Sequence, residues 1–401
     1  MTVAGIPVEY WLFAATLLGI ALLHRHTLVV ALSGLGAITV WKLLVTGFAA
    51  GPGFTGLGLH LAHEAVTFVN LFCLLTGFAF LARHFEVSQL PLLLPRYLPD
   101  GPAGAGALLA LVFVISSFLD NIAAALIGGA MAHSLFRARV HVGYLAAIVA
   151  AANAGGAGSV IGDTTTTMMW IAGVPPLDVF HAYVAALTAF VVCAIPASLQ
   201  QHRHAPIIRD PPRRLHIDGA RLTIVAGILG SAVAINVLVN SRFPEHAGDF
   251  PFIGATVIAT LLLSIPWRRP DPAVLVPGLR SSLFLVALVA CASMMPVERL
   301  PAASWQTAFG LGFVSAVFDN IPLTALALQQ NGYDWGMLAF AVGFGGSMIW
   351  FGSSAGVALS SLYAEARSAG RWLRHGWHVP LAYVIGFLAL YLLLGWNPRP
   401  V

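Results

Sequence analysis

Two aspartate–asparagine pairs stand inside stretches of the chain that are otherwise apolar. The pairs are Asp120-Asn121 and Asp319-Asn320, and the residues around them match in type and order. An ionisable side chain at membrane depth costs a few kcal/mol or more, so such residues are usually retained for a function. The two pairs are therefore candidates for a site that binds and moves an ion.

A third aspartate follows a glycine-rich stretch. Gly155 precedes Asp163 in the first half of the chain, and Gly345 precedes Ser353 at the same spacing in the second half. Glycine weakens a helix, and backbone groups freed at membrane depth must line a cavity or be buried in protein. We therefore expect helices broken near their middles at 142–171 and 335–362. Small residues that let helices pack tightly would also explain the glycines, but not the acid.

Amide and hydroxyl side chains accompany the three acids Asp120, Asp163 and Asp319. The residues expected to line a cavity with these acids are Ser116, Asn121, Asn153, Thr164, Thr165, Ser315, Asn320, Ser353 and Ser354. Hard cations such as Na⁺ prefer oxygen ligands, and broken helices add free carbonyl groups. We expect Na⁺ to bind at the three acids with Asn121 and Asn320. The alternative is that the acids only hold the structure together through hydrogen bonds.

The composition indicates whether the chain folds in water or in a membrane. Of its 401 residues, 58% are hydrophobic and only 9% are charged, against roughly 25% charged in a soluble domain. This favours a polytopic membrane protein in a lipid bilayer, and the net charge of +4 suits cytoplasmic loops rather than nucleic acid. The three cysteines lack metal-ligand spacing, and the sequence has no phosphate loop, zinc motif or nucleophile elbow. We expect neither an enzyme nor a cofactor.

The apolar stretches form two sets of six on either side of a basic linker, which indicates an internal duplication. The predicted first repeat is 1–199, the linker is 200–218 and the second repeat is 219–401. Each repeat contains one stretch with an aspartate–asparagine pair, at about 105–135 and 304–330, and one broken helix. The N-terminus has no basic segment, so we expect no cleavable signal peptide.

The positions of the arginines predict how the chain crosses the membrane. If all the apolar stretches cross and the linker is cytoplasmic, the arginines divide almost evenly between the two sides. If the two aspartate–asparagine stretches are re-entrant hairpins, nearly all arginines become cytoplasmic and both termini lie outside. The predicted fold is all-α, with two inverted repeats. Each repeat has about five transmembrane helices, one re-entrant helical hairpin and one broken helix, as in many secondary transporters.

Buried carboxylates that lie close together bind protons more readily, so a cation and protons would compete for these aspartates. Such competition is the minimal mechanism of proton-coupled exchange. Glu64, near the start of a span, is a possible gate or proton relay. It is equally well explained as an acid at the membrane interface.

At these motifs the chain resembles the ion-transporter superfamily, and most closely its NhaD-type Na⁺/H⁺ antiporters. The motifs are Leu119-Asp120-Asn121, the run from Asn153 through Gly162-Asp163-Thr164-Thr165, the run from Ser315 through Asp319-Asn320-Ile321-Pro322, and the glycine-serine run from Gly345 to Val357. The resemblance implies exchange of Na⁺ or Li⁺ for H⁺ by alternating access at the repeat interface. It also implies a bacterial inner-membrane location and a possible homodimer.

Two other functions compete with this one. The first is an organic-anion or oxyanion permease coupled to Na⁺ or H⁺, carrying citrate, a dicarboxylate or arsenite. Such a site would favour arginines or neutral amides, whereas the predicted hairpin tips carry acids. The second is a channel or membrane scaffold without coupled transport, which the duplicated acid sites disfavour.

Overall fold

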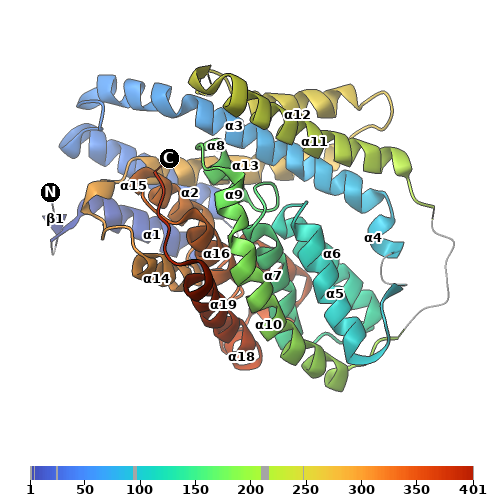
Figure 1. Cartoon of the computed structure of the whole chain (residues 1–401). Coiled ribbons are helices and arrows are strands. Elements are labelled where there is room, and N and C mark those ends of the chain that lie inside the picture. The colour runs from blue at the N-terminus through green and yellow to red at the C-terminus, as the bar shows by residue number, and fades with distance from the viewer. Residues whose placement is uncertain are drawn as a thin grey trace. The chain divides into compact units, whose positions relative to one another are not determined.

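The computed structural model describes residues 2–3, 5–23, 26–93, 97–208, 216–246 and 248–400. Regular structure in these residues is helical apart from one antiparallel pair of strands, β1 (Thr2–Val3) and β2 (Ile6–Pro7) (Figure 1). The expected all-α class is confirmed. The predicted linker at 200–218 lies partly outside the described residues, which omit 209–215.

Several helical segments are long enough to span a bilayer. Among the described residues, five are at least 18 residues long and strongly apolar: Thr27–Thr46, Gly53–Val87, Pro176–His204, Gly219–Val239 and Pro272–Ser293. A sixth span results if α18 (Ala369–His375) and α19 (His378–Leu394), which are bent by 62° at a short break, cross together. About 20 apolar residues cross the hydrocarbon core, so the chain is a multi-pass membrane protein.

The N-terminal part contains α1 (Val8–Leu22), α2 (Thr27–Trp41), the π-helix η1 (Lys42–Thr46), α3 (Gly53–Val87) and α4 (Leu90–Leu93). The middle part contains α9 (Pro176–Phe180), α10 (Ala182–His204), α11 (Gly219–Arg242), α12 (Phe252–Leu263) and α13 (Leu275–Ser293). Short 3₁₀ turns are η3 (Pro244–His246), η4 (Pro272–Val274), η5 (Val297–Arg299) and η6 (Ala364–Arg367).

The stretches that carry the polar motifs are pairs of helices with short non-helical joints. The aspartate–asparagine stretches are α5 (Gly101–Ser116) with α6 (Asn121–Leu135), and α14 (Trp305–Ser315) with α15 (Asn320–Gln330). The glycine-rich stretches are α7 (Val142–Ala157) with α8 (Thr164–Ile171), and α16 (Trp335–Gly345) with α17 (Ser354–Leu362). The joints coincide with the motifs. The re-entrant course and the inverted orientation of the two halves stay predictions.

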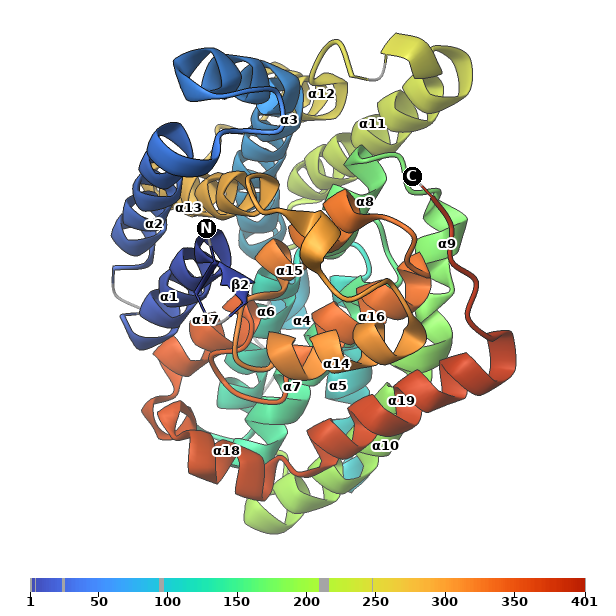
Figure 2. The same cartoon turned by 90° about the vertical axis from the view of Figure 1, so that its left-hand side faces the viewer.

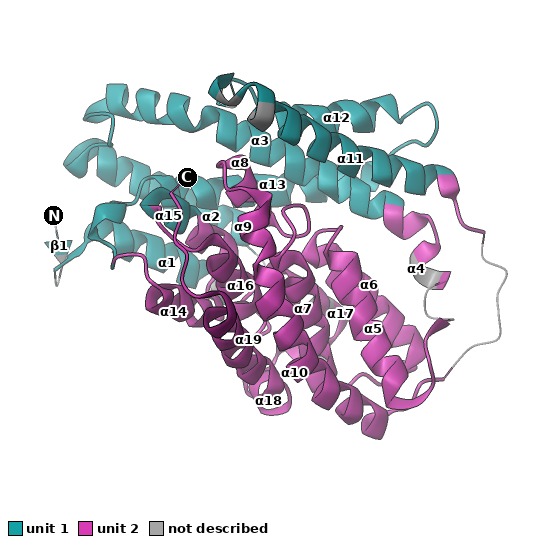
Figure 3. Ribbon diagram, viewed as in Figure 1, with its two compact units in different colours: residues 1–84, 220–301, 325–330 teal, residues 85–219, 302–324, 331–401 magenta. Residues whose placement is uncertain are grey.

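The chain forms two compact units, which Figure 3 colours separately. Unit 1 consists of residues 1–84, 220–301 and 325–330, and unit 2 of residues 85–219, 302–324 and 331–401. Each unit therefore combines segments from both halves of the sequence. The predicted repeats at 1–199 and 219–401 describe sequence similarity, whereas the compact units describe packing, so the repeat boundaries stay predictions.

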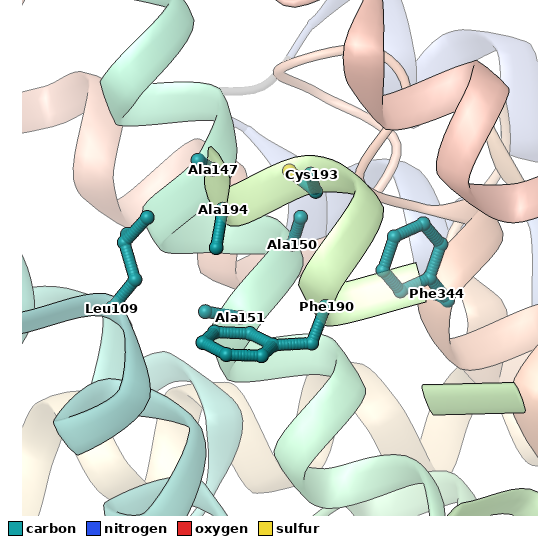
Figure 4. Close-up of a pocket in the computed structure, with 8 residues that line it drawn as sticks. All are labelled: Leu109, Ala147, Ala150, Ala151, Phe190, Cys193, Ala194 and Phe344. Carbon is teal, nitrogen blue, oxygen red and sulfur yellow. The ribbon is translucent and has the colours of Figure 1, made fainter. Parts of the chain in front are cut away.

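In unit 2, the alanine-rich helix α7 is buried from Gly143 to Ala157 and packs against α5, α6 and α10. Small side chains allow such close approach between helices in a membrane. Helix α10 also runs beside α19, as Figures 1 and 2 both show. Figure 4 shows a gap among alanines of α7 and α10, which has no room for a water molecule. This part of unit 2 is a packed core rather than a substrate cavity.

Two glycines bring the glycine-rich stretches against the aspartate–asparagine stretches. A Cβ atom at Gly155 of α7 would overlap the carbonyl group of Phe113 on α5. A Cβ atom at Gly345 of α16 would likewise overlap the carbonyl group of Gly312 on α14. The same close approach thus occurs twice, at positions that correspond in the two halves of the sequence.

Unit 1 is held together by polar contacts between helices as well as by apolar packing. The side-chain oxygen of Asn70 on α3 accepts a hydrogen bond from the backbone N–H of Gly254 on α12, at 2.6 Å. The hydroxyl groups of Thr76 and Ser282 lie 3.0 Å apart, which joins α3 to α13. Polar pairs of this kind fix the register of helices that are otherwise apolar.

Candidate functional site

The two paired aspartates occupy equivalent positions in unit 2, each just before a helix begins. Asp120 Oδ1 accepts a hydrogen bond from the backbone N–H of Ile122 at 2.9 Å, and Asp319 Oδ1 accepts one from Ile321 at 3.1 Å. Aspartate is favoured at this position because it satisfies a free N–H group of the first helical turn. Both side chains are partly exposed.

The second oxygen of each of these carboxylates contacts a hydroxyl group from a broken helix. Thr164 Oγ1 lies 3.4 Å from Asp120 Oδ2, and Ser354 Oγ donates to Asp319 Oδ2 at 2.8 Å. Thr164 begins α8 and Ser354 begins α17, so the two contacts occupy similar places in the two halves of the sequence. These are hydroxyl groups that the sequence analysis expects near the acids, and the role of both as a transport site stays a prediction. Each pair offers hard oxygen atoms of the type that binds Na⁺.

Asp163 lies between the two asparagines of the paired motifs. Its Oδ1 accepts from Asn121 Nδ2 at 3.1 Å, and its Oδ2 is 3.5 Å from Asn320 Nδ2. Thr165 Oγ1 also donates to Asp163 Oδ2, at 2.6 Å. Asp163 is only 2% exposed. The Asp163 carboxylate therefore contacts the asparagine of both aspartate–asparagine pairs.

Asn153 extends this network to the second broken helix. Its Oδ1 accepts from Asn121 Nδ2 at 3.0 Å, and its Nδ2 donates to Ser347 Oγ at 2.9 Å and to Ser353 Oγ at 3.2 Å. Both polar atoms of this fully buried amide group, Oδ1 and Nδ2, therefore have hydrogen-bond partners. Ser353 in turn accepts from the backbone N–H of Gly356 and caps α17.

Ser116 and Ser315 bond to backbone rather than to the carboxylates. Ser116 Oγ donates to the carbonyl group of Ala152 and Ser315 Oγ to that of Val342, both at 2.6 Å. These bonds again occupy similar places in the two halves of the sequence, joining α5 to α7 and α14 to α16. The two serines therefore position the joints, and their hydroxyl protons are already engaged.

Four helices begin at this network: α6, α8, α15 and α17. A helix N-terminus carries about half a positive charge, which stabilises a nearby carboxylate. Asp120 and Asp163 are the N-cap residues of α6 and α8, and Asp319 directly precedes α15. Within the described part of the chain, none of these three carboxylates forms an ion pair with a basic side chain. The helix ends and the amide and hydroxyl groups are their observed polar surroundings.

The three acids do not form a compact metal cage. In the residues that the structure describes, no three side chains of His, Cys, Asp or Glu are close enough to hold one metal ion. A cation bound here would take at most two carboxylates, with the remaining ligands from hydroxyl, amide or carbonyl oxygens. The expected shared site at all five of Asp120, Asn121, Asp163, Asp319 and Asn320 stays a prediction.

Glu64 lies in unit 1, in the first half of α3, and is half-buried. Its carboxylate forms no hydrogen bond with the described residues. The predicted role of Glu64 as a gate or relay stays a prediction.

Sequence reasoning missed two residues that contact the network. Ser347 accepts a hydrogen bond from Asn153, and a Cβ atom at Gly343 would lie 3.3 Å from Asp163 Oδ2. Gly343 aligns with Asn153 when Gly155 is aligned with Gly345. That internal alignment was a usable signal, because it identifies the position at which an amide side chain in one half is replaced in the other by a glycine that lies close to Asp163.

Comparisons with known proteins reinforce the interpretation of these motifs. The chain is 28% identical over 284 residues to a protein named sodium/proton antiporter 2 from Arabidopsis thaliana, covering 62% of this chain and 67% of that protein. It is 29% identical over 332 residues to the Na⁺/H⁺ antiporter NhaD of Vibrio cholerae, covering 71% of this chain and 69% of the relative. The resemblance to NhaD-type antiporters is confirmed.

A second plant protein, sodium/proton antiporter 1 of Arabidopsis thaliana, is 30% identical over 288 residues. Those residues are 62% of this chain but only 49% of the relative, so the chain spans about half of that protein's length. No family model matches the chain. These relatives are named as antiporters rather than as enzymes, in line with the expectation from the sequence.

Proposed function

We propose that this protein exchanges Na⁺ or Li⁺ for H⁺ across the bacterial inner membrane, with Asp120, Asp163 and Asp319 as the groups that bind both. The observation that carries the proposal is the hydrogen-bonded network that joins three buried or half-buried carboxylates to neutral oxygen ligands. A carboxylate without a basic partner in a desolvated site gains most from a small cation or a proton. The names of the relatives agree with this chemistry.

The exchange follows from competition at the same oxygens. When a carboxylate binds Na⁺ it releases its proton to the side that the site faces. When the site faces the other side, a proton displaces Na⁺ from the carboxylate. Net exchange requires that the site does not move when both the cation and the proton are absent. Asp120 with Thr164 and Asp319 with Ser354 are two equivalent half-sites, and Asp163 couples them.

Two contacts within unit 2 support the re-entrant topology. The rings of His141 and His375 have centroids 5.0 Å apart, and those of His141 and His204 are 5.4 Å apart. His204 lies in the predicted basic linker, so all three histidines belong on the cytoplasmic side if the linker does. A chain whose apolar stretches all crossed would put His375 on the opposite side.

A second contact in unit 2 also supports the re-entrant topology. Arg399 Nη1 lies 2.8 Å from Asp178 Oδ1. Re-entrant hairpins put both residues outside, whereas a chain that crossed at every apolar stretch would separate them by the bilayer. The hairpin topology therefore accounts for a contact at each end of the unit, with the linker cytoplasmic and the C-terminal residues outside.

One observation favours the rival, an organic-anion permease. Four helix N-termini face the network, and helix N-termini are common binding sites for anions. The three aspartates occupy or adjoin three of these ends and neutralise them. We therefore rank cation exchange first, and the test includes an anion.

The test uses inside-out vesicles with a respiration-generated pH gradient that quenches a dye. NaCl, LiCl, KCl and citrate are added in turn to wild type, Asp120→Asn and Asp319→Asn. We expect Na⁺ or Li⁺ to restore fluorescence in wild type and in neither variant. Asparagine caps a helix as well as aspartate does, so both variants should fold.

The matched control is Asp334→Asn. Asp334 is also a buried N-cap in unit 2, but it accepts from Met337 and Asn397, away from the network. Asp334→Asn should exchange ions like wild type. A response to citrate with none to any cation would replace this proposal with the anion permease, and a response that survives both substitutions would exclude these aspartates.

A further inference from the structure

Unit 1 contains a separate cleft of about 380 Å³ that is lined by charged side chains. Its charged and titratable lining residues are Glu9, Lys42, His60, Glu298 and Arg299. One water occupies about 30 Å³ in the liquid, and ligand sites start near 300 Å³, so the cleft can hold a small molecule. Ionisable residues gathered at the end of apolar helices indicate a functional site.

Lys42 forms one wall of this cleft and is the only lysine in the sequence. It begins the π-helix η1, a type of local distortion that is frequent at functional sites. Its Nζ atom donates to the carbonyl oxygen of Met294 at 2.7 Å and lies 5.6 Å from the centre of the Phe48 ring. An ammonium group has three N–H donors, so two remain for a ligand in the cleft.

Glu9 supplies the opposite charge. It lies in the first turn of α1 and is only 4% exposed. Its carboxylate has no hydrogen bond or ion pair with the part of the chain that the structure describes. Burying an unpaired charge is costly, and the cost falls when a counter-charge is bound. Glu9 and Lys42 therefore line one cleft without pairing with each other.

Part of the wall of the cleft is built from stacked rings. The rings of Phe48 and His60 are stacked at 5.8 Å, and His60 Nε2 lies 3.0 Å from Ser293 Oγ. Phe48 is also fixed by two backbone hydrogen bonds to Gly51, at 2.9 and 3.0 Å. A cleft with fixed walls loses little entropy when a ligand binds.

We propose that this cleft binds a small zwitterion, with the ligand's ammonium group at Glu9 and its phosphate or carboxylate group at Lys42. Glu298 and Arg299 repeat the same pair of charges at the exposed part of the cleft. A simple cation or a simple anion satisfies only one of the two buried charges. The ligand is either a free solute or the headgroup of an aminophospholipid, since both carry this pair of charges. The proposal does not depend on the antiport function.

The single lysine provides a site-specific probe. The full-length protein is grown with lysine labelled with ¹³C at Cε, purified in detergent, and observed by NMR, so that its only lysine signal reports on the cleft. The ligand that is added is O-phosphoethanolamine, compared with ethanolamine and inorganic phosphate. We expect a saturable shift of the Lys42 signal with phosphoethanolamine, and at least about tenfold weaker binding of the two single-charge compounds.

The variant is Glu9→Gln, which keeps the size and polarity of the side chain and removes its charge. We expect it to weaken phosphoethanolamine binding by about tenfold or more. Glu245→Gln, on η3 and outside the cleft lining, is the matched control and should bind like wild type. The melting temperatures of both variants show whether each is folded.

A second arm distinguishes the two sources of the ligand. The labelled protein is placed in nanodiscs of phosphatidylethanolamine or of phosphatidylcholine, each mixed with the same anionic lipid. A Glu9-dependent shift between the two lipids, without a response to the free compound, assigns the cleft to the lipid headgroup. No response in either arm, or equal responses to phosphoethanolamine, ethanolamine and phosphate, overturns the proposal.

Discussion

The substitution Asn121→Asp tests the central network most directly. Asn121 Nδ2 donates to Asp163 Oδ1 at 3.1 Å and to Asn153 Oδ1 at 3.0 Å. Aspartate at this position replaces the donor with an oxygen that faces a second carboxylate. Two unit charges at this distance repel by about 5 kcal/mol at an effective dielectric constant of about 20. That energy is large enough that the pair retains a proton at neutral pH.

A retained proton occupies the carboxylate that Na⁺ must bind. We therefore expect Asn121→Asp to reduce Na⁺-dependent proton exchange at neutral pH by at least about tenfold, with partial recovery as the pH rises. The assay is dye dequenching in inside-out vesicles over a range of pH, at equal amounts of protein in the membrane. The measured quantity is the midpoint pH of the Na⁺ response.

Asn153→Asp is the control, because it adds the same charge to the same network. Its altered atom faces the hydroxyl groups of Ser347 and Ser353, which can rotate to donate. The pH profile of Asn153→Asp should move less than that of Asn121→Asp. An unchanged profile for Asn121→Asp, or a larger shift for Asn153→Asp, would refute the hydrogen-bond arrangement at Asp163.

Three further predictions concern packing, charge and topology. Gly155→Ala should destabilise the protein by about 1–3 kcal/mol in thermal unfolding, because the added methyl group overlaps a backbone carbonyl of α5, whereas Gly310→Ala, which has open space, should not. The pKa of Asp271 lies below its ordinary value of 3.8, chiefly because its carboxylate accepts a backbone hydrogen bond. A lowered folded-state pKa stabilises the protein at pH values above the ordinary pKa, and this stabilisation is lost as the pH falls below it. Asp271→Asn should therefore show a smaller loss of melting temperature than wild type on acidification through this range. In a background without native cysteines, Arg371→Cys should react with an impermeant maleimide from the cytoplasmic side and Arg399→Cys from outside; the reverse result would contradict the re-entrant hairpins.

The polar joints could be found from the sequence because they break two strong patterns. Asp120 and Asp319 interrupt apolar runs, and Gly155 and Gly345 mark helix breaks in the same order in each half. These signals depend on residue type and spacing alone. Each aspartate also precedes a helical run, which is the pattern of an N-cap. The positions of the helix starts at the site were therefore predictable from local chemistry.

The partners across the joints were not predictable in this way. The bonds from Asn153 to Ser347 and Ser353 link residues that are far apart in the sequence. No periodicity records such a pairing, because it depends on how complete helices pack. The same reason explains the two compact units, each of which draws on both halves of the chain. The bond from Lys42 to Met294 in unit 1 likewise joins segments that are far apart in the sequence.

The differences between the two halves are as informative as their similarity. The predicted duplication would account for the matching pairs Asp120 with Thr164 and Asp319 with Ser354. It does not account for Asp163, whose counterpart in the second half is Ser353. A fourth carboxylate at that position would add repulsion to a network that has no basic partner among the described residues, whereas a serine still caps α17. The centre therefore combines two equivalent half-sites with one carboxylate that bonds to both asparagines, and the proposed exchange depends on that single shared acid to couple the two sides.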